Sequence, residues 1–93
     1  MDAQLESRIR EAAAHLVRRG ARAVYVFGSA TTGRLREDSD IDLAVEGLPE
    51  AIFYRAMAEA SRIVGRTVDL VELDRGDGIG DVLRRSGEFA RVA

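Results

Sequence analysis

The sequence predicts an α/β protein of the α+β kind, in which helices pack on a small mixed β-sheet. Residues 3–19 and 49–64 carry apolar side chains at helical spacing, which predicts two amphipathic helices. Three short apolar runs rich in β-branched and aromatic residues predict strands: 23–27, 41–45 and 67–73. Because helices and strands alternate along a chain of only 93 residues, residues 1–93 are expected to form a single domain.

The first predicted strand leads into a tight turn. Its five residues, 23–27, are mostly apolar, so both of its faces are expected to be covered. The strand ends at Gly28 and Ser29, and residues 29–32 are expected to form a helical turn. A polar connector then leads to the second strand at 41–45.

The second half of the chain is also predicted to contain a helix followed by a strand. Pro49 fits the first position of the second helix, and Gly65 fits its end. The strand at 67–73 is expected to be central in the sheet. The remaining elements are predicted as a loop, a short helix and an edge strand: 74–80, 79–85 and 89–92.

Composition narrows the classes of function. The net charge is −2, which gives no indication of binding to nucleic acid or to a membrane surface. All 14 basic residues are arginine, so a Schiff-base lysine and the lysine of a P-loop are excluded. The absence of cysteine excludes disulfides, thiolate metal sites and a cysteine nucleophile. Without an apolar signal region or a window of 18 apolar residues, the chain is expected to be soluble and cytoplasmic.

Asp40 and Asp42 stand at the start of the second predicted strand and are the first candidates for a metal site. On a strand, side chains at i and i+2 point to the same face, about 6–7 Å apart at Cα. Magnesium is a hard cation that takes carboxylate oxygens together with substrate phosphates. Two such ions can clamp the attacking and leaving oxygens of a phosphoryl transfer. The alternative is that the pair only marks the solvent face of a strand.

Asp69 lies between apolar residues inside the third predicted strand. Because burying an unpaired carboxylate is costly, two explanations compete. Either this face of the sheet is locally exposed, or Asp69 converges on Asp40 and Asp42. The nearby Glu72 and Asp74 are interpreted as ordinary surface residues.

Gly28 and Ser29 are candidates for phosphate binding. Ten residues separate Ser29 from Asp40, which is close enough for a hairpin-like return of the chain. Gly28 lets the main chain approach a phosphate closely. Ser29 can donate its hydroxyl and its main-chain N–H to phosphate oxygens at the start of a helical turn. The alternative is a simple tight turn.

Two competing motifs fail at specific residues. The stretch GSATTGR resembles a P-loop in its glycine spacing, but Arg34 replaces the lysine and Leu35 replaces the Ser or Thr that binds magnesium. The aspartates at alternate positions resemble the start of an EF-hand loop. There, Leu43 stands where the loop needs glycine and Pro49 where it needs a bidentate glutamate.

Taken together, the Gly28-Ser29 pair, the Asp40-x-Asp42 pair and the later Asp69 resemble the DNA polymerase β-like nucleotidyltransferase superfamily. The short length and the string SDIDLAV are similar to its minimal nucleotidyltransferase (MNT) branch, which includes antitoxins paired with HEPN-domain toxins. The resemblance covers nearly the whole chain and implies the polymerase β-like nucleotidyltransferase fold. It implies that Asp40 and Asp42 bind metal, with Asp69 as a further ligand or general base, and that Gly28 and Ser29 contact a triphosphate.

The resemblance also implies an activity. A nucleotidyltransferase of this branch uses Mg²⁺, with two ions expected, to transfer AMP from ATP to a hydroxyl acceptor. The implied acceptor is a tyrosine of a partner HEPN toxin, so the protein is expected to act as an antitoxin by AMPylation. A homodimer or hetero-oligomer could complete the site of so short a chain. Two alternatives stay open: a non-catalytic antitoxin that neutralises its toxin by binding, and transfer to a small molecule such as an aminoglycoside.

Overall fold

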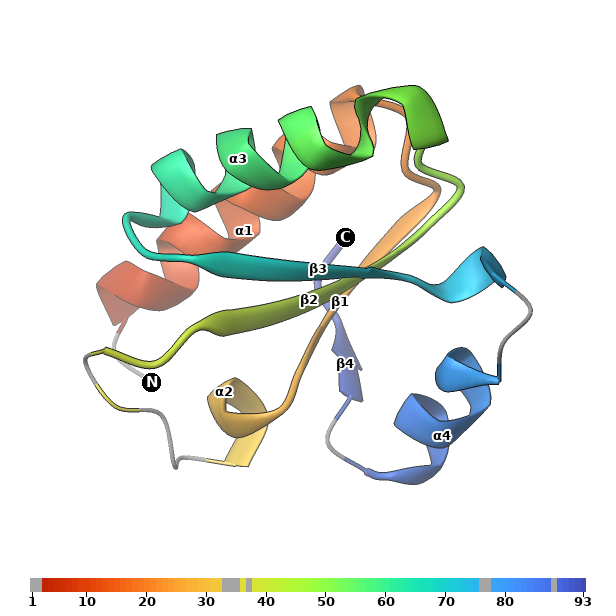
Figure 1. The fold of residues 1–93 in the computed structure, drawn as a ribbon. Coiled ribbons are helices and arrows are strands. Elements are labelled where there is room, and N and C mark those ends of the chain that lie inside the picture. The colour runs from red at the N-terminus through yellow and green to blue at the C-terminus, as the bar shows by residue number, and fades with distance from the viewer. Residues whose placement is uncertain (1–2, 33–35, 37, 76–77, 88) are drawn as a thin grey trace.

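A four-stranded sheet with helices packed on it forms the fold, as Figure 1 shows. The computed structural model describes residues 3–32, 36, 38–75, 78–87 and 89–93. Its elements in chain order are α1 (Ala3–Arg18), β1 (Ala23–Phe27), α2 (Ser29–Thr32), β2 (Ile41–Glu46), η1 (Glu50–Ile52), α3 (Phe53–Val64), β3 (Val68–Glu72), η2 (Leu73–Arg75), α4 (Ile79–Arg85) and β4 (Phe89–Arg91). No helix in the described part of the chain is long and apolar enough to cross a membrane.

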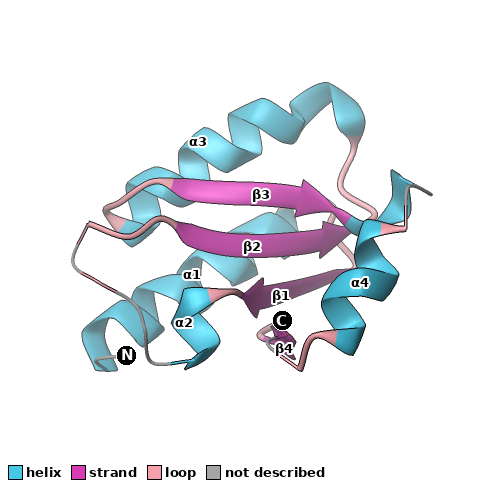
Figure 2. Ribbon diagram, turned by 60° about the horizontal axis from the view of Figure 1, so that its bottom comes forward, coloured by secondary structure: helices cyan, strands magenta, loops and turns pink. Residues whose placement is uncertain are grey.

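The sheet is mixed, as the sequence predicts, with the strand order β3-β2-β1-β4. β1 pairs antiparallel with both β2 and β4, whereas β2 and β3 run parallel. Parallel neighbours need a crossover connection, and α3 provides it between β2 and β3. α1 and α3 lie side by side over one face of the sheet, and α4 lies on the other side (Figures 1 and 2).

The main hydrophobic cluster lies on the sheet face beneath α1 and α3. In β2, Leu43 and Val45 are fully buried in this core, whereas Asp42 points to the opposite face. On that opposite face of β1, Tyr25 and Phe27 are only half-buried. No residue of β1 is exposed, and Ala23 on this same face is buried, so the expectation that both faces of this strand would be covered holds. Toward β3 the same face of the sheet is accessible, because Asp69 is exposed.

The third strand differs most from its prediction. β3 lies at the edge of the sheet, so the expectation that it is central is wrong. It is also shorter than the predicted 67–73, and η2 occupies the start of the predicted loop 74–80. Pro49 precedes η1 rather than opening α3. The bounds of α4 match the prediction, and β4 is an edge strand, as predicted, that ends at Arg91.

A polar cluster joins α1 to α3 beside the core. Glu59 of α3 accepts a hydrogen bond from Nε of Arg19 at 2.9 Å and forms an ion pair with the same guanidinium. Its Oε1 also lies 2.8 Å from Nε2 of His15. The Arg19 hydrogen bond, followed by the contact with His15, lowers the pKa of Glu59 from 4.5 to about 2. The ionised carboxylate therefore stabilises the packing of the two helices.

Replacing Glu59 by glutamine should lower the free energy of unfolding at neutral pH. The same change at Glu6 should do less, because its partner Arg10 is an exposed neighbour on the same helix. Since the pKa of Glu59 is depressed by folding, its contribution is present above pH 4.5 and is lost as the pH falls toward about 2. Urea denaturation across this pH range measures the difference between wild type and Glu59→Gln. A difference that stays constant with pH would contradict this account.

Candidate functional site

The parallel pairing of β2 with β3 places two aspartates side by side on the accessible face of the sheet. Asp42 of β2 lies directly opposite Asp69 of β3 in the register of the two strands. Neighbouring strands are about 4.8 Å apart, so carboxylates in register on one face are close neighbours. Asp69 is exposed and Asp42 is half-buried. Asp69 is therefore exposed on its sheet face and lies beside Asp42, while its convergence on Asp40 stays a prediction.

Asp40 is the third carboxylate of this group. It is exposed and immediately precedes β2, so of the predicted pair only Asp42 is a strand residue. The pKa of Asp42 is raised, first because the group is partly buried and then because the charges of Asp69 and Asp40 repel its ionised form. The three carboxylates therefore share one electrostatic environment, which we call the aspartate group.

Gly28 ends β1 next to this group. Its φ of +73° lies in the left-handed region, which favours glycine. A Cβ atom at this position would lie only 2.6 Å from Oδ2 of Asp42. The preceding residue, Phe27, is paired in register with Asp42. Glycine thus leaves the Asp42 carboxylate unobstructed, while a contact between Gly28 and a phosphate stays a prediction.

The segment after Gly28 forms α2, so the predicted helical turn is confirmed. The main-chain N–H and the Oγ1 of Thr31 both donate to the carbonyl oxygen of Gly28, at 3.0 and 2.8 Å. These two bonds fix the direction in which the chain leaves β1. The structure describes the main chain of Ser29 at the start of α2 but not its side chain, so the role of its hydroxyl stays a prediction.

The chemistry of the aspartate group suits magnesium, a hard cation that binds carboxylate oxygens. Burial raises the pKa of Asp42 most, and a divalent cation would relieve the repulsion from Asp69 and Asp40 that raises it further. Among the residues that the structure describes, no three His, Cys, Asp or Glu side chains are drawn together tightly enough to hold a metal by themselves. Magnesium usually takes one or two carboxylates and completes its shell with phosphates and water. The group therefore fits an ion that binds together with a triphosphate.

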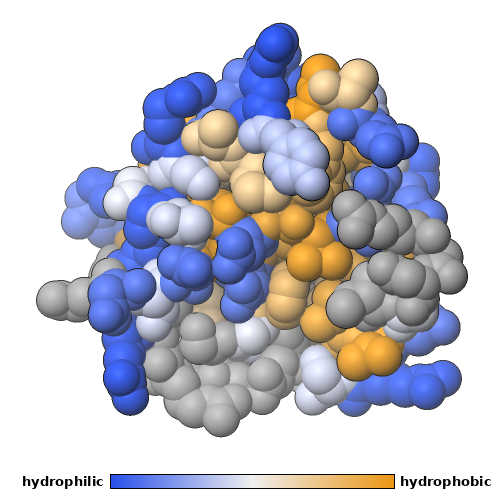
Figure 3. Space-filling model, viewed as in Figure 1, coloured by the Kyte–Doolittle hydropathy of each residue, from blue (hydrophilic) through white to orange (hydrophobic). Residues whose placement is uncertain are grey.

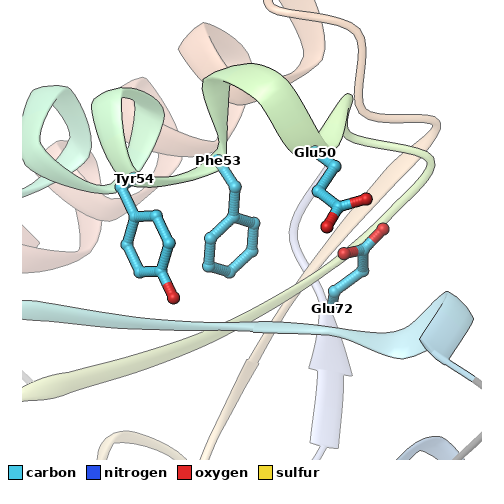
Figure 4. A pocket seen from close by; sticks show the side chains of 4 residues that line it. All are labelled: Glu50, Phe53, Tyr54 and Glu72. Carbon is cyan, nitrogen blue, oxygen red and sulfur yellow. The ribbon is translucent and has the colours of Figure 1, made fainter.

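A second surface feature lies away from the aspartate group. Figure 3 shows apolar side chains gathered between α3 and α4, with hydrophilic residues around them. A hollow of about 260 Å³ lies there at the start of α3, lined by Glu50, Phe53, Tyr54 and Glu72. Figure 4 shows the two glutamate carboxylates close together at one end of this hollow. Neither Asp42 nor Gly28 lines it, so we treat it as distinct from the candidate site.

Two residues, Asp74 and Arg66, make long-range hydrogen bonds that the sequence patterns do not reveal. Asp74, interpreted from the sequence as ordinary surface, accepts hydrogen bonds from the N–H of Gly47 at 2.8 Å and from Arg22 at 3.1 Å. Asp74 is exposed, as interpreted from the sequence, and it also links two segments of the fold. Arg66 donates to two carbonyl groups in the connector before Asp40. No local signal predicts either contact, because each partner lies at least 27 residues away along the chain.

Several solved structures share this fold. A candidate minimal nucleotidyltransferase gives a TM-score of 0.77 at 28% sequence identity, covering 100% of this chain and 96% of that chain. A toxin–antitoxin structure with AMP-PNP gives 0.74 at 21% identity, covering 95% of this chain and 72% of that one. A complex of a tri-AMPylated Shewanella oneidensis HEPN toxin with an MNT antitoxin gives 0.72 at 17% identity, covering 96% and 71%. These similarities support the predicted polymerase β-like fold.

A match to a protein family identifies a relationship more specifically than a similar fold does. No curated protein matches the chain. The family model described as "Polymerase beta, Nucleotidyltransferase" matches residues 11–85, a segment that contains Gly28 and the whole aspartate group. Since this match covers most of the 93 residues, the chain belongs to the polymerase β nucleotidyltransferase family.

Proposed function

We propose that the protein is a Mg²⁺-dependent nucleotidyltransferase that transfers AMP from ATP to a tyrosine hydroxyl of a partner HEPN toxin, and that it thereby acts as an antitoxin. The observation that carries the proposal is the register that sets Asp42 opposite Asp69. On the other side of Asp42, Gly28 leaves space at the carboxylate. Carboxylates beside an open turn suit a metal-bound triphosphate.

The proposed roles follow the positions of the side chains. Asp40 and Asp42 hold Mg²⁺, with two ions proposed, and the metal supplies charge neutralisation for the triphosphate. The main chain at Gly28 and Ser29 contacts the phosphates. Asp69, exposed on the same sheet face as Asp42, accepts the proton of the acceptor hydroxyl or serves as a further metal ligand.

The transfer balances without any further reactant. The acceptor oxygen forms a bond to the α-phosphorus of ATP while the bond between the α- and β-phosphates breaks. Pyrophosphate leaves, AMP stays on the acceptor, and the hydroxyl proton passes to a base. Positioning and charge stabilisation provide most of the rate enhancement in such phosphoryl-type transfers. The protein therefore needs few groups beyond the aspartates and the turn at Gly28.

Two structural neighbours support the choice of nucleotide and partner. One is a toxin–antitoxin structure with AMP-PNP, an analogue of ATP. The other is an MNT antitoxin bound to a HEPN toxin that carries AMP groups. A protein partner is also supported by the apolar surface between α3 and α4 (Figure 3). Tyr54 of α3 and Val82 of α4 are 76% and 63% exposed.

The first prediction concerns the reaction itself. With purified toxin, ATP and Mg²⁺, the wild-type protein should add one or more AMP units to the toxin, as measured by intact-mass spectrometry. The double variant Asp40→Asn, Asp42→Asn should react at least about 100-fold more slowly, because a metal ion contributes several kcal/mol to the stability of the transition state.

The single variant Asp42→Asn provides the folding control. It should melt no lower than wild type at neutral pH, because a carboxylate whose pKa is raised by folding destabilises the folded state when it is ionised. Neutralisation of the toxin without a gain in mass would show that binding alone is the mechanism. Transfer to an aminoglycoside but not to the toxin would show a small-molecule enzyme.

The second prediction concerns Gly28. Gly28→Ala should both destabilise the protein and impair transfer, because the new Cβ would meet Oδ2 of Asp42. The matched control is Gly87→Ala, since Gly87 has a similar φ of +75° and a Cβ there would meet nothing within 4 Å. Both variants should lose about 1–3 kcal/mol from backbone strain, measured by urea denaturation. Equal transfer rates in the two variants would contradict the role given to Gly28.

A further inference from the structure

Arg66 binds the connector that leads into β2. Its Nη1 donates to the carbonyl oxygen of Arg36 at 2.9 Å and to that of Ser39 at 3.1 Å. Within the connector, the N–H of Arg36 donates to Oγ of Ser39 at 2.9 Å, and the N–H of Ser39 donates to the carbonyl oxygen of Arg36 at 3.1 Å. One guanidinium therefore holds both ends of a hydrogen-bonded turn directly before Asp40.

The turn between α3 and β3 holds Arg66 itself in place. Gly65 ends α3 in the left-handed conformation, as predicted, and its N–H donates to the carbonyl oxygen of Ser61. Oγ of Ser61 accepts a hydrogen bond from the N–H of Val68 at 2.9 Å and donates to the carbonyl oxygen of Met57 at 3.0 Å. Figure 2 shows this turn at the same end of the sheet as the connector. Arg66 thus extends from a segment that is held by hydrogen bonds toward the carbonyl groups of Arg36 and Ser39.

Consecutive residues of this turn hold the peptide groups on both sides of Asp40. The carbonyl group of Ser39, which precedes Asp40, accepts from Arg66 at 3.1 Å. The N–H of Ile41, which follows Asp40, donates to the carbonyl oxygen of Thr67 at 2.9 Å. The same segment continues into β3 and reaches Asp69 two residues after Thr67. The place of Asp40 relative to the rest of the aspartate group is therefore set through these two contacts.

We propose that Arg66 is a positioning residue of the metal site, which fixes the main chain before Asp40 so that its carboxylate faces Asp42 and Asp69. The proposal rests on the metal-binding role proposed above for Asp40. Arg66 acts through the main chain of Ser39 and not by touching the nucleotide. Asp42 needs no such support because the strand pairing of β2 holds it, whereas Asp40 lies just outside the strand.

The charge of Arg66 separates this proposal from a simple electrostatic effect. A positive charge near a cation site opposes cation binding, so removing it would strengthen binding if charge alone mattered. If Arg66 positions Asp40, removing Arg66 should instead weaken cation binding. Loss of a group that orients a metal ligand typically lowers metal affinity about 10-fold to 100-fold.

The test compares three variants in a direct binding experiment. Arg66→Met keeps a long side chain without a donor, and Arg66→Lys keeps a charged donor. The matched control is Arg62→Met, because Arg62 is exposed on α3 and has no ion-pair partner that the structure describes. Mn²⁺ is titrated into each labelled protein, and paramagnetic broadening of the amide resonances of residues 39–42 and 69 reports affinity without any measurement of activity.

Arg66→Met should need about tenfold more Mn²⁺ than wild type for the same broadening. Arg66→Lys should recover most of the affinity, and Arg62→Met should match wild type. If Arg66→Met melts far below wild type, Arg66→Gln serves in the same comparison, with weaker binding again expected. Unchanged or tighter binding in the neutral variants of Arg66 would overturn the proposal. A lack of broadening in wild type would instead remove the metal site, and with it the proposed function.

Discussion

The parallel pairing of β2 with β3 is the interaction on which the candidate site depends. It sets Asp42 and Asp69 opposite each other, although 26 residues lie between them in the sequence. A parallel pair needs a crossover connection, and α3 provides it while packing against α1 to close the core. The same helix therefore stabilises the fold and brings the two carboxylates into register. A shift of one residue in this pairing would turn Asp69 to the core side of the sheet.

The face on which the aspartates lie explains why they can be tolerated together. The residues of β2 and β3 in the main core cluster point to α1 and α3. The aspartates on the opposite face therefore displace no side chain of this cluster. Partial burial and like charges still raise the pKa of Asp42, which means that the group carries repulsion that a bound cation would relieve. Groups that destabilise a fold but serve a ligand are common at functional sites. Asp42 and Asp69 thus lie on the sheet face opposite the main core cluster.

Local geometry explains which parts of this site the sequence could predict. The apolar run before Gly28 predicts the strand and the turn that the structure shows. The shared strand face predicted for Asp40 and Asp42 is not shown, because Asp40 lies just before β2. The position of β3 at the edge of the sheet could not be predicted, because an apolar run such as 67–73 looks the same at the edge or in the centre. The contacts of Arg66 could not be predicted from the sequence either, because they join segments that become neighbours only after folding.

The aspartate group and the turn at Gly28 are proposed to form one site for a metal and a triphosphate, and this is the central claim. A crystal structure with Mn²⁺ and AMP-PNP tests it most directly, because anomalous scattering locates the metal independently of the nucleotide. The expected result is a metal peak at coordination distance from the Asp40 and Asp42 carboxylates, with phosphates against the main chain at Gly28. A metal peak or nucleotide bound instead at the hollow beside Glu50 and Glu72 would contradict it.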